Sequence, residues 1–236
     1  MPAYYFDSDY CESTTLRDGQ PIRLRLVRSD DKEMFRRGLD KLSPESRVRR
    51  FFVMKERLTN EELRYFTEID QIDHVAIGAE RACPAGVGDG ADGSDGAGAF
   101  EGLGVARFIR CPDHADTAEA AVAVIDEMQG KGLGSLLFQR LVAAARARGI
   151  SRLRCEVLSS NQAMRDFLSG AMPSAFKIAQ SGPVLTIEME LPEIEPAHPH
   201  VEPPRQSDIY RLFTQVAKGA IDLPRALSRF FLGEKS

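Results

Sequence analysis

Residues 129–134 read Gln129-Gly130-Lys131-Gly132-Leu133-Gly134 and lie between an apolar, strand-like segment (residues 120–125) and a helix-forming stretch (residues 135–146). Glycines let the backbone approach a ligand closely and turn its N–H groups toward it. The first turn of a helix adds unpaired N–H donors and the positive end of the helix dipole. The sequence therefore predicts a site for an anion such as a pyrophosphate, which needs no basic side chain there.

The spacing of these glycines differs from two common phosphate-binding motifs. A Walker A loop needs Gly-x-x-x-x-Gly-Lys-Ser/Thr, and a dinucleotide fingerprint needs Gly-x-Gly-x-x-Gly. Here glycine occupies every second position, at Gly130, Gly132 and Gly134. The run resembles the Gln/Arg-x-x-Gly-x-Gly/Ala loop of the GCN5-related N-acetyltransferase (GNAT) superfamily, which holds the pyrophosphate of acetyl-CoA. The alternative is a plain glycine-rich turn between a strand and a helix.

The resemblance extends to both sides of the loop. It includes residues 43–52 and 58–63, the pair Ala118-Glu119, and residues 156–157 and 161–164. These segments look like the bacterial protein lysine acetyltransferases (Pat-type domains) of the superfamily, and the likeness covers residues 16–191. It implies acetyl-CoA as co-substrate and a protein lysine as acceptor, such as a lysine of an acyl-CoA synthetase.

The resemblance also implies a fold of the α/β (α+β) class. We expect a GNAT fold, with a mixed, mostly antiparallel central sheet flanked by helices, in residues 16–191. Outside that core the composition predicts a loosely ordered N-terminus (1–15), a flexible hairpin loop rich in Gly, Ala and Asp (84–100), a Pro/Glu-rich linker (192–206) and a C-terminal amphipathic helical extension (207–236). The extension could pack on the domain, on a second copy in a homodimer, on a membrane surface or on another partner.

Local signals predict where several elements begin. Asp18-Gly19 predicts the turn of a hairpin that spans Leu16 to Val27. Asp30 with Glu33, and Thr59 with Glu62, match the capping box that starts a helix. Ser43-Pro44 predicts a further helix start, because proline is favoured at the first helical position.

Composition argues against several other classes of protein. The net charge is −4 and no basic stripe with aromatic residues is present, which argues against nucleic-acid binding. The sequence contains no run of about 18 apolar residues, so it predicts no membrane-spanning helix. The four cysteines, at positions 11, 83, 111 and 155, lack the spacing of metal ligands. We therefore expect reduced thiols in a cytoplasmic protein, with no metal.

The implied reaction, acetyl transfer to an amine, needs a base and an oxyanion site. A lysine ammonium must lose a proton before it attacks, and the thioester oxygen gains negative charge. Glu119 is the first candidate base, because it shares a strand face with the small residues Ala121 and Ala123, where we expect partial desolvation. Glu156 is the second. The alternative for both is an exposed carboxylate paired with Arg152, Arg154 or Arg107.

The resemblance also assigns residues to the cofactor. Backbone N–H groups of Val122, Ala123 and Val124 would bind the pantetheine arm and the carbonyl oxygen. The pyrophosphate would lie on Gln129, Gly130, Lys131, Gly132, Leu133, Gly134 and Ser135. Asn161 would either contact the cofactor or cap a helix.

Two departures from the family pattern keep other functions open. Phe167 stands where many members have a tyrosine that protonates the thiolate, and residues 169–176 replace a compact turn. The competing hypotheses are an acetyltransferase for a small-molecule amine and a catalytically silent acyl-CoA-binding sensor.

Overall fold

The computed structural model describes residues 6–83, 100–171 and 176–191. They form one eight-stranded sheet in the order β1-β2-β3-β4-β5-β6-β8-β7. Its strands are β1 Cys11–Thr15, β2 Pro21–Leu26, β3 His74–Ala82, β4 Phe100–Cys111, β5 His114–Val124, β6 Arg152–Leu158, β7 Phe176–Ser181 and β8 Val184–Glu190. Every neighbouring pair is antiparallel except β5 and β6. The expected mixed, mostly antiparallel sheet is confirmed.

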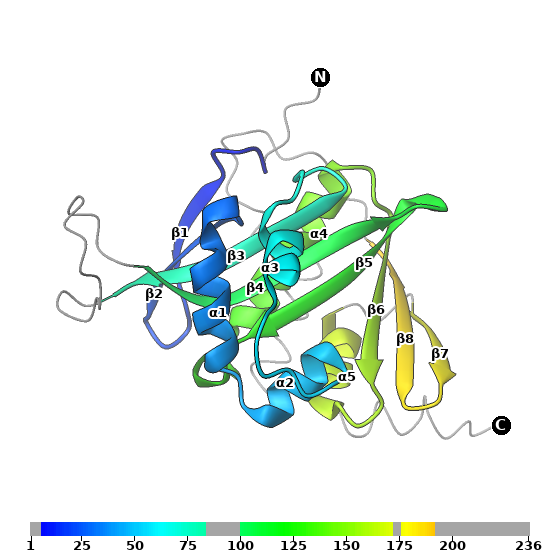
Figure 1. Cartoon of the computed structure of the whole chain (residues 1–236). Coiled ribbons are helices and arrows are strands. Elements are labelled where there is room, and N and C mark those ends of the chain that lie inside the picture. The colour runs from blue at the N-terminus through cyan, green and yellow to red at the C-terminus, as the bar shows by residue number, and fades with distance from the viewer. Residues whose placement is uncertain (1–5, 84–99, 172–175, 192–236) are drawn as a thin grey trace.

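The helices cover both faces of this sheet (Figure 1). They are α1 Lys32–Asp40, α2 Pro44–Phe51, α3 Asn60–Thr67, α4 Leu133–Ala147 and α5 Gln162–Ala171. Helix α4 packs against β3, β4 and β5, and α1 packs against β4 from the other side. The central strands are therefore enclosed between two helical layers, as expected for the GNAT fold.

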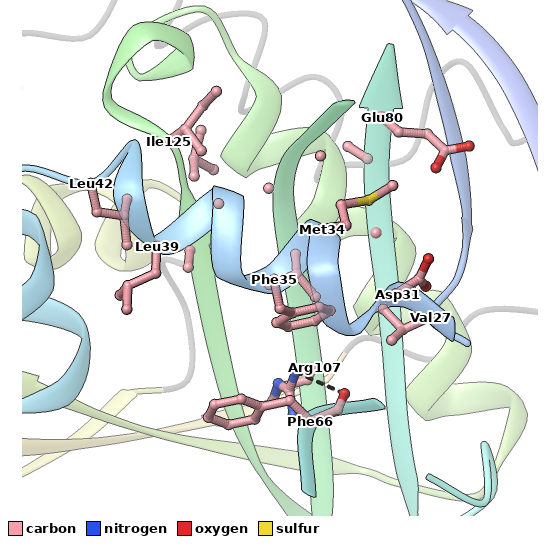
Figure 2. A pocket seen from close by; sticks show the side chains of 18 of the residues that line it. Val27, Asp31, Met34, Phe35, Leu39, Leu42, Phe66, Glu80, Arg107 and Ile125 are labelled. Atoms are coloured by element: carbon pink, nitrogen blue, oxygen red, sulfur yellow. Dashed lines mark hydrogen bonds between the residues drawn. The ribbon is translucent and has the colours of Figure 1, made fainter. Parts of the chain in front are cut away.

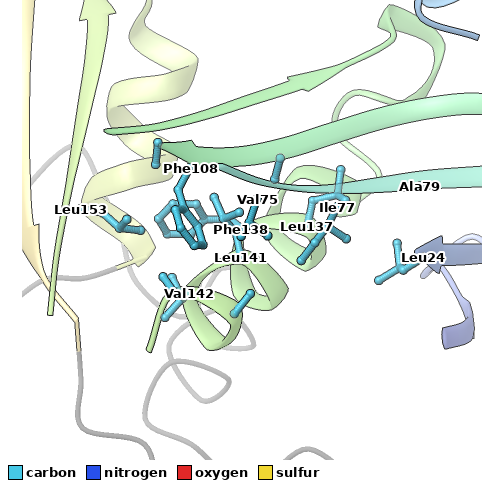
Figure 3. Close-up of a cluster of buried hydrophobic side chains, with 14 of the residues drawn as sticks. Leu24, Val75, Ile77, Ala79, Phe108, Leu137, Phe138, Leu141, Val142 and Leu153 are labelled. Atoms are coloured by element: carbon cyan, nitrogen blue, oxygen red, sulfur yellow. The ribbon is translucent and has the colours of Figure 1, made fainter. Parts of the chain in front are cut away.

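The apolar core lies between α4 and the sheet. Figure 3 shows Phe138 and Leu141 of α4 packed against Phe108 of β4 and Val75 of β3. Phe108, Leu141 and Val75 are completely buried. Because successive strand residues point to opposite faces, the alternate residues of the same strands face α1, α2 and α3. Three buried charged residues of the strands, Arg25, Glu80 and Arg107, lie on that second face.

A buried ion network joins α1 to the edge of that second face. Arg25 donates to Asp31 from Nη1 (2.8 Å) and Nη2 (2.6 Å), and from Nε to Glu80 (3.0 Å). Glu80 also accepts from Nε of Arg23 at 2.6 Å. Asp31 is 7% exposed and Glu80 is 2% exposed. The two carboxylates raise the pKa of Arg25, so this buried guanidinium is fully compensated.

The same network corrects one predicted helix start. Asp31 is the carboxylate that bonds the backbone near the start of α1, and it accepts from the N–H of Arg28 at 2.7 Å. The predicted Asp30–Glu33 capping box is absent among the described residues. Asp31 takes this position because its other contacts are to Arg25. The Thr59–Glu62 capping box is confirmed by reciprocal bonds of 3.2 and 2.8 Å. Ser43 caps α2 with Pro44 at its first position, as predicted.

The prediction of a loosely ordered N-terminus is wrong for residues 6–15. Residues 11–15 form β1, which pairs with β2 across the predicted Asp18-Gly19 turn, so the hairpin begins at Cys11 rather than Leu16. Phe6 and Tyr10 are buried with their rings 4.6 Å apart. These aromatic side chains join the core and order the segment. Residues 1–5 lie outside the described part, as do the predicted loop at 84–99, the linker and the C-terminal extension.

Replacing Glu80 with Gln should destabilise the fold, because Arg23 and Arg25 would lose a buried counter-charge. We expect the free energy of unfolding, measured in urea, to fall by roughly 3 kcal/mol. This is the lower end of the range for breaking a buried ion pair, because Asp31 still pairs with Arg25. Glu45→Gln removes the carboxylate of the exposed Glu45–Arg49 pair and should cost less than about 1 kcal/mol. Equal losses in the two variants would contradict this.

Candidate active site

The site originates where β5 and β6 separate. The two strands run parallel and are paired only at Thr117–Arg152, Ala118–Leu153 and Glu119–Arg154. Beyond Glu119 they diverge, as Figure 1 shows. Between them opens a cleft of about 470 Å³, lined by residues 119–124 of β5, residues 154–157 of β6, and parts of α2, α3, β4, the glycine loop and the start of α5.

The predicted glycine loop lies at the end of this cleft. A short 3₁₀ turn, Asp126–Met128, follows β5, and α4 begins at Leu133 with Gly132 as its N-cap, two residues earlier than predicted. Gly130 and Gly132 have φ values of 74° and 89°, which favour glycine. No side chain of the described residues caps the first turn of α4. Its N–H groups remain available to an anion.

Gln129, a predicted cofactor residue, anchors the loop with its side chain. Its Nε2 lies 3.0 Å from Oδ1 of Asp126, 3.2 Å from the carbonyl oxygen of Val124 and 3.3 Å from Oγ of Ser46. These contacts link the loop to the end of β5 and to α2. Gln129 also lines the cleft, together with Gly130 and Gly134.

The other predicted loop residues lie outside the cleft lining. Leu133 is completely buried in the core. Lys131 points toward the first hairpin, with Nζ 3.5 Å from Oδ2 of Asp18. Gly132 and Ser135 belong to the first turn of α4, beside the cleft. Their contribution to an anion site would come from backbone N–H groups.

The backbone of β5 offers donors to the cleft. The N–H of Ile125 donates to the carbonyl oxygen of Leu103 on β4 at 3.0 Å. Because a strand alternates the direction of its amides, the N–H of Ala123 also faces β4, and those of Val122 and Val124 face the gap toward β6. Of the three predicted backbone donors, Val122 and Val124 are therefore the two directed into the cleft.

Glu119 and Glu156 both line the cleft, and both side chains are exposed. Glu119 lies at the last residue pair before β5 and β6 diverge. Its exposure differs from the partial desolvation expected from its alanine neighbours, because its side chain points out of the sheet into the open cleft. The backbone N–H of Glu119 also bonds to Cys111, and the nearby carboxylate contributes to raising the pKa of that thiol, after burial.

The alternative of a simple surface ion pair is not seen for either glutamate in the described part of the chain. Arg152 pairs with Asp116 at 2.9 Å, and Arg154 pairs with Glu188 at 3.3 Å. Arg107 contacts His74 and Phe66 instead. The two carboxylates therefore remain available for another role.

Asn161 caps α5, which was one of its two predicted roles. Its Oδ1 accepts from the N–H of Met164 at 3.2 Å, and the residue is 7% exposed. It lines the cleft as well, so contact with a cofactor stays a prediction. The side chain of Phe167 and residues 172–175 lie outside the described part.

Sequence reasoning gives no ligand-binding role to three basic side chains around the site. The Nε of Arg17 would lie 3.7 Å from a Cβ atom placed on Gly132, so this exposed arginine lies beside the anion loop. Arg50 of α2 and Arg107 of β4 line the cleft. They also border a second cavity of about 100 Å³ beneath α1, in which Figure 2 shows Phe35, Phe66 and Arg107 together. No local sequence pattern marks these three residues.

A sheet that splits between two parallel strands, with an uncapped helix start at the end of the split, defines an N-acetyltransferase type of domain. Residues 55–170 match the model of the acetyltransferase (GNAT) family. This chain therefore contains a domain of the GNAT family. Among the described residues, no cluster of His, Cys, Asp and Glu could hold a metal, and no helix is long and apolar enough to cross a membrane.

The similar proteins include two that are named Pat. Acetyltransferase Pat of Mycolicibacterium smegmatis is 30% identical over 181 residues, which cover 76% of this chain and 49% of that protein. Acetyltransferase PA5475 of Pseudomonas aeruginosa is 28% identical over 64% of this chain and 74% of its own length. The GNAT domain of S. lividans PAT superimposes with a TM-score of 0.64 at 28% identity, covering 81% of this chain and 99% of that one. The domain is thus homologous to Pat acetyltransferases, and the chain spans about half the length of the Mycolicibacterium relative.

Replacing Gly132 with Ala should weaken CoA binding. A side chain at φ 89° is strained by roughly 1–2 kcal/mol, so the loop amides would move. We expect the dissociation constant for CoA, measured by calorimetry, to rise roughly tenfold, equivalent to about one hydrogen bond to a charged group. Gly149→Ala is the matched control, because Gly149 has φ 76° at the far end of α4. Gly149→Ala should lose a similar amount of thermal stability and keep its CoA affinity. Equal CoA affinities of Gly132→Ala and Gly149→Ala would refute the assignment of the loop to CoA.

His74 should make stability depend on pH. Burial and the charge of Arg107 lower the pKa of His74 from 6.5 to about 4. The unfolded chain therefore binds a proton that the folded chain does not, and the free energy of unfolding decreases as pH falls from about 6.5 toward about 4. Urea titrations at about pH 7 and about pH 5 measure this decrease. The free energy of unfolding should fall less between the two pH values in His74→Gln than in the wild type. His114→Gln, at the exposed start of β5, should behave like the wild type.

Proposed function

We propose that the domain transfers an acetyl group from acetyl-CoA to the ε-amine of a protein lysine in the cytoplasm, by direct attack. The observation that carries the proposal is the cleft itself. It combines unpaired strand amides, an uncapped helix start and an exposed, unpaired carboxylate. The homology to Pat acetyltransferases supports a protein acceptor, such as an acyl-CoA synthetase.

The residues of the cleft suit the steps of this reaction. Loop amides from Gly130 to Ser135, with Arg17 nearby, would hold the diphosphate. The N–H groups of Val122 and Val124 would donate to the thioester oxygen as it gains charge. Glu119 would accept the proton that the ammonium must lose before the nitrogen attacks. The C–N bond forms, the nitrogen releases its second proton to water, and the C–S bond breaks. CoA leaves as a thiolate, whose pKa near that of cysteine (about 8.5) makes it a workable leaving group without an acid.

The charges in the cleft bear on the small-molecule alternative. A polyamine acceptor would be favoured by an acidic cleft. The carboxylates of Glu119 and Glu156 are accompanied here by Arg50, Arg107 and Arg154, so the lining is mixed. This composition gives no support to a polycationic acceptor. The hypothesis of a catalytically silent sensor rests on residues 169–176, all of whose side chains lie outside the described part.

Glu119→Gln should separate catalysis from binding. Because the amide cannot accept the proton, we expect kcat to fall by at least about tenfold, within the range for loss of a general base. CoA affinity should remain as in the wild type, because Glu119 lies away from the loop. Glu156→Gln, in the same cleft on β6, is the matched control and should keep most of its activity. A loss confined to Glu156→Gln would assign the base to Glu156 instead.

The acceptor requires a separate test with labelled acetyl-CoA and purified acyl-CoA synthetases. We expect label on lysines of the synthetase with the wild type, and far less with Gly132→Ala at limiting acetyl-CoA. Transfer to small amines without transfer to any protein would replace the lysine acceptor with a small-molecule one.

A further inference from the structure

Arg107 is a buried arginine whose contacts supply no counter-charge. It lies in the middle of β4, is 4% exposed, and faces the cleft. Nη1 lies 3.2 Å from Nε2 of His74, and Nη2 donates to the carbonyl oxygen of Phe66 at 3.4 Å. The guanidinium lies 4.5 Å from the ring centre of Phe66 and 5.8 Å from that of Phe35, and Figure 2 shows it beside the two rings. No carboxylate within the described ranges contacts it.

The neighbours of Arg107 confirm that its charge is uncompensated. Since the pKa of His74 is about 4, the imidazole is neutral at neutral pH and offers only a lone pair. Burial and then the charge of Arg50 lower the pKa of Arg107 to about 9, which still leaves the guanidinium protonated at pH 7. Two cations are therefore held close together in the lining of the cleft.

Arg50 differs from the other arginines of α2. Arg49 pairs with Glu45 at 2.6 Å, and Arg47 donates to the carbonyl oxygens of Leu42 and Lys55. Arg50 is half-buried, and its only described contact is with the ring of Phe51, 5.2 Å away. Tyr65 lies near enough to favour the charged forms of both Arg50 and Arg107. The pair thus resembles a site that lacks its anion.

A buried cation without a partner is costly, and such a group marks a place where a ligand supplies the opposite charge. Guanidinium groups bind carboxylates with two parallel hydrogen bonds. The position of the pair indicates which substrate brings the carboxylate. Arg107 lies opposite Ala121, on the strand face of Glu119 and only two positions from it along β5, whereas β5 continues for three more residues before the turn that leads to the glycine loop. Along β5, Arg107 is therefore nearer to Glu119 than to the loop that would hold the diphosphate.

We propose that Arg107 and Arg50 bind a carboxylate carried by the amine acceptor, close to the amine that Glu119 deprotonates. This inference rests on the proposed function of the cleft. In a protein acceptor the carboxylate would belong to an acidic residue beside the target lysine. In a free amino acid it would be the α-carboxylate. Both sources present the same group to the same two guanidinium groups.

Binding measurements test the subsite without requiring turnover. Two peptides that differ only in Glu or Gln beside a central lysine are titrated by calorimetry into the CoA-bound protein, and lysine is compared with lysinamide. We expect the acidic member of at least one pair to bind roughly tenfold tighter to the wild type, as for a buried charge pair. The negative net charge of the chain would not produce this preference by itself. The pair that shows the preference identifies the source of the carboxylate.

Arg107→Gln and Arg50→Gln should each abolish the preference. The dissociation constants of the two members of a pair should then differ by less than about twofold. Arg37→Gln removes an exposed charge from the outer face of α1 and should keep the preference. Thermal unfolding shows whether Arg107→Gln still folds; if it does not, Arg50→Gln decides. Equal binding of both members of both pairs to the wild type, or a preference that survives in Arg50→Gln and in folded Arg107→Gln, overturns the proposal.

The outcomes also separate this inference from the proposed reaction. Preferential binding of an acidic acceptor without acetyl transfer would leave the subsite intact and refute the proposed function. Acetyl transfer with equal kcat/KM for the acidic and neutral acceptors would support the reaction and refute the subsite.

Discussion

The structure depends on the separation of β5 from β6 after a single short stretch of pairing. Only three residue pairs join the two strands, so the amides of Val122 and Val124 face a gap inside the sheet rather than another strand. Unpaired backbone donors are costly when buried and are normally matched by water or a ligand. The fold tolerates the gap because β5 is paired with β4 along residues 118–124 and is supported from behind by α4. A rigid strand with one free side is thus held ready for a ligand.

The alternation of side chains along β5 separates stability from chemistry. Ala118 and Ala120 are buried on the α4 side and belong to the core, whereas Glu119, Ala121 and Ala123 face the helices of the opposite side. The small side chains leave space above the strand, and the carboxylate lies where that space begins. A register shift of one residue would exchange the two sets, so the packing of α4 also fixes the position of Glu119.

Features set by neighbouring residues could be predicted from the sequence, and features set by distant segments could not. The glycine loop, the Asp18-Gly19 turn and the Thr59–Glu62 box depend on a few adjacent residues, and each appears where expected. The ordering of residues 6–15 depends on β2 and on α4, whose Arg140 binds Glu12. The exposure of Glu119 could not be predicted from its neighbours, because it depends on how distant segments leave the cleft open above its face of the sheet. Arg17 reaches Gly132 only through the folding of the first hairpin.

Two arginines on the same face of the sheet show why the charge at the cleft is not a requirement of the fold. Arg25 and Arg107 are both buried, but Arg25 is bound by Asp31 and Glu80, whereas Arg107 has aromatic rings, a neutral imidazole and a carbonyl oxygen. The fold is therefore able to place carboxylates against a buried guanidinium on this face. A leucine or methionine at position 107 would pack against Phe35 and Phe66 without the desolvation of a charge. Stability alone gives no reason for an arginine there, and the opening of its surroundings into the cleft gives a reason based on binding.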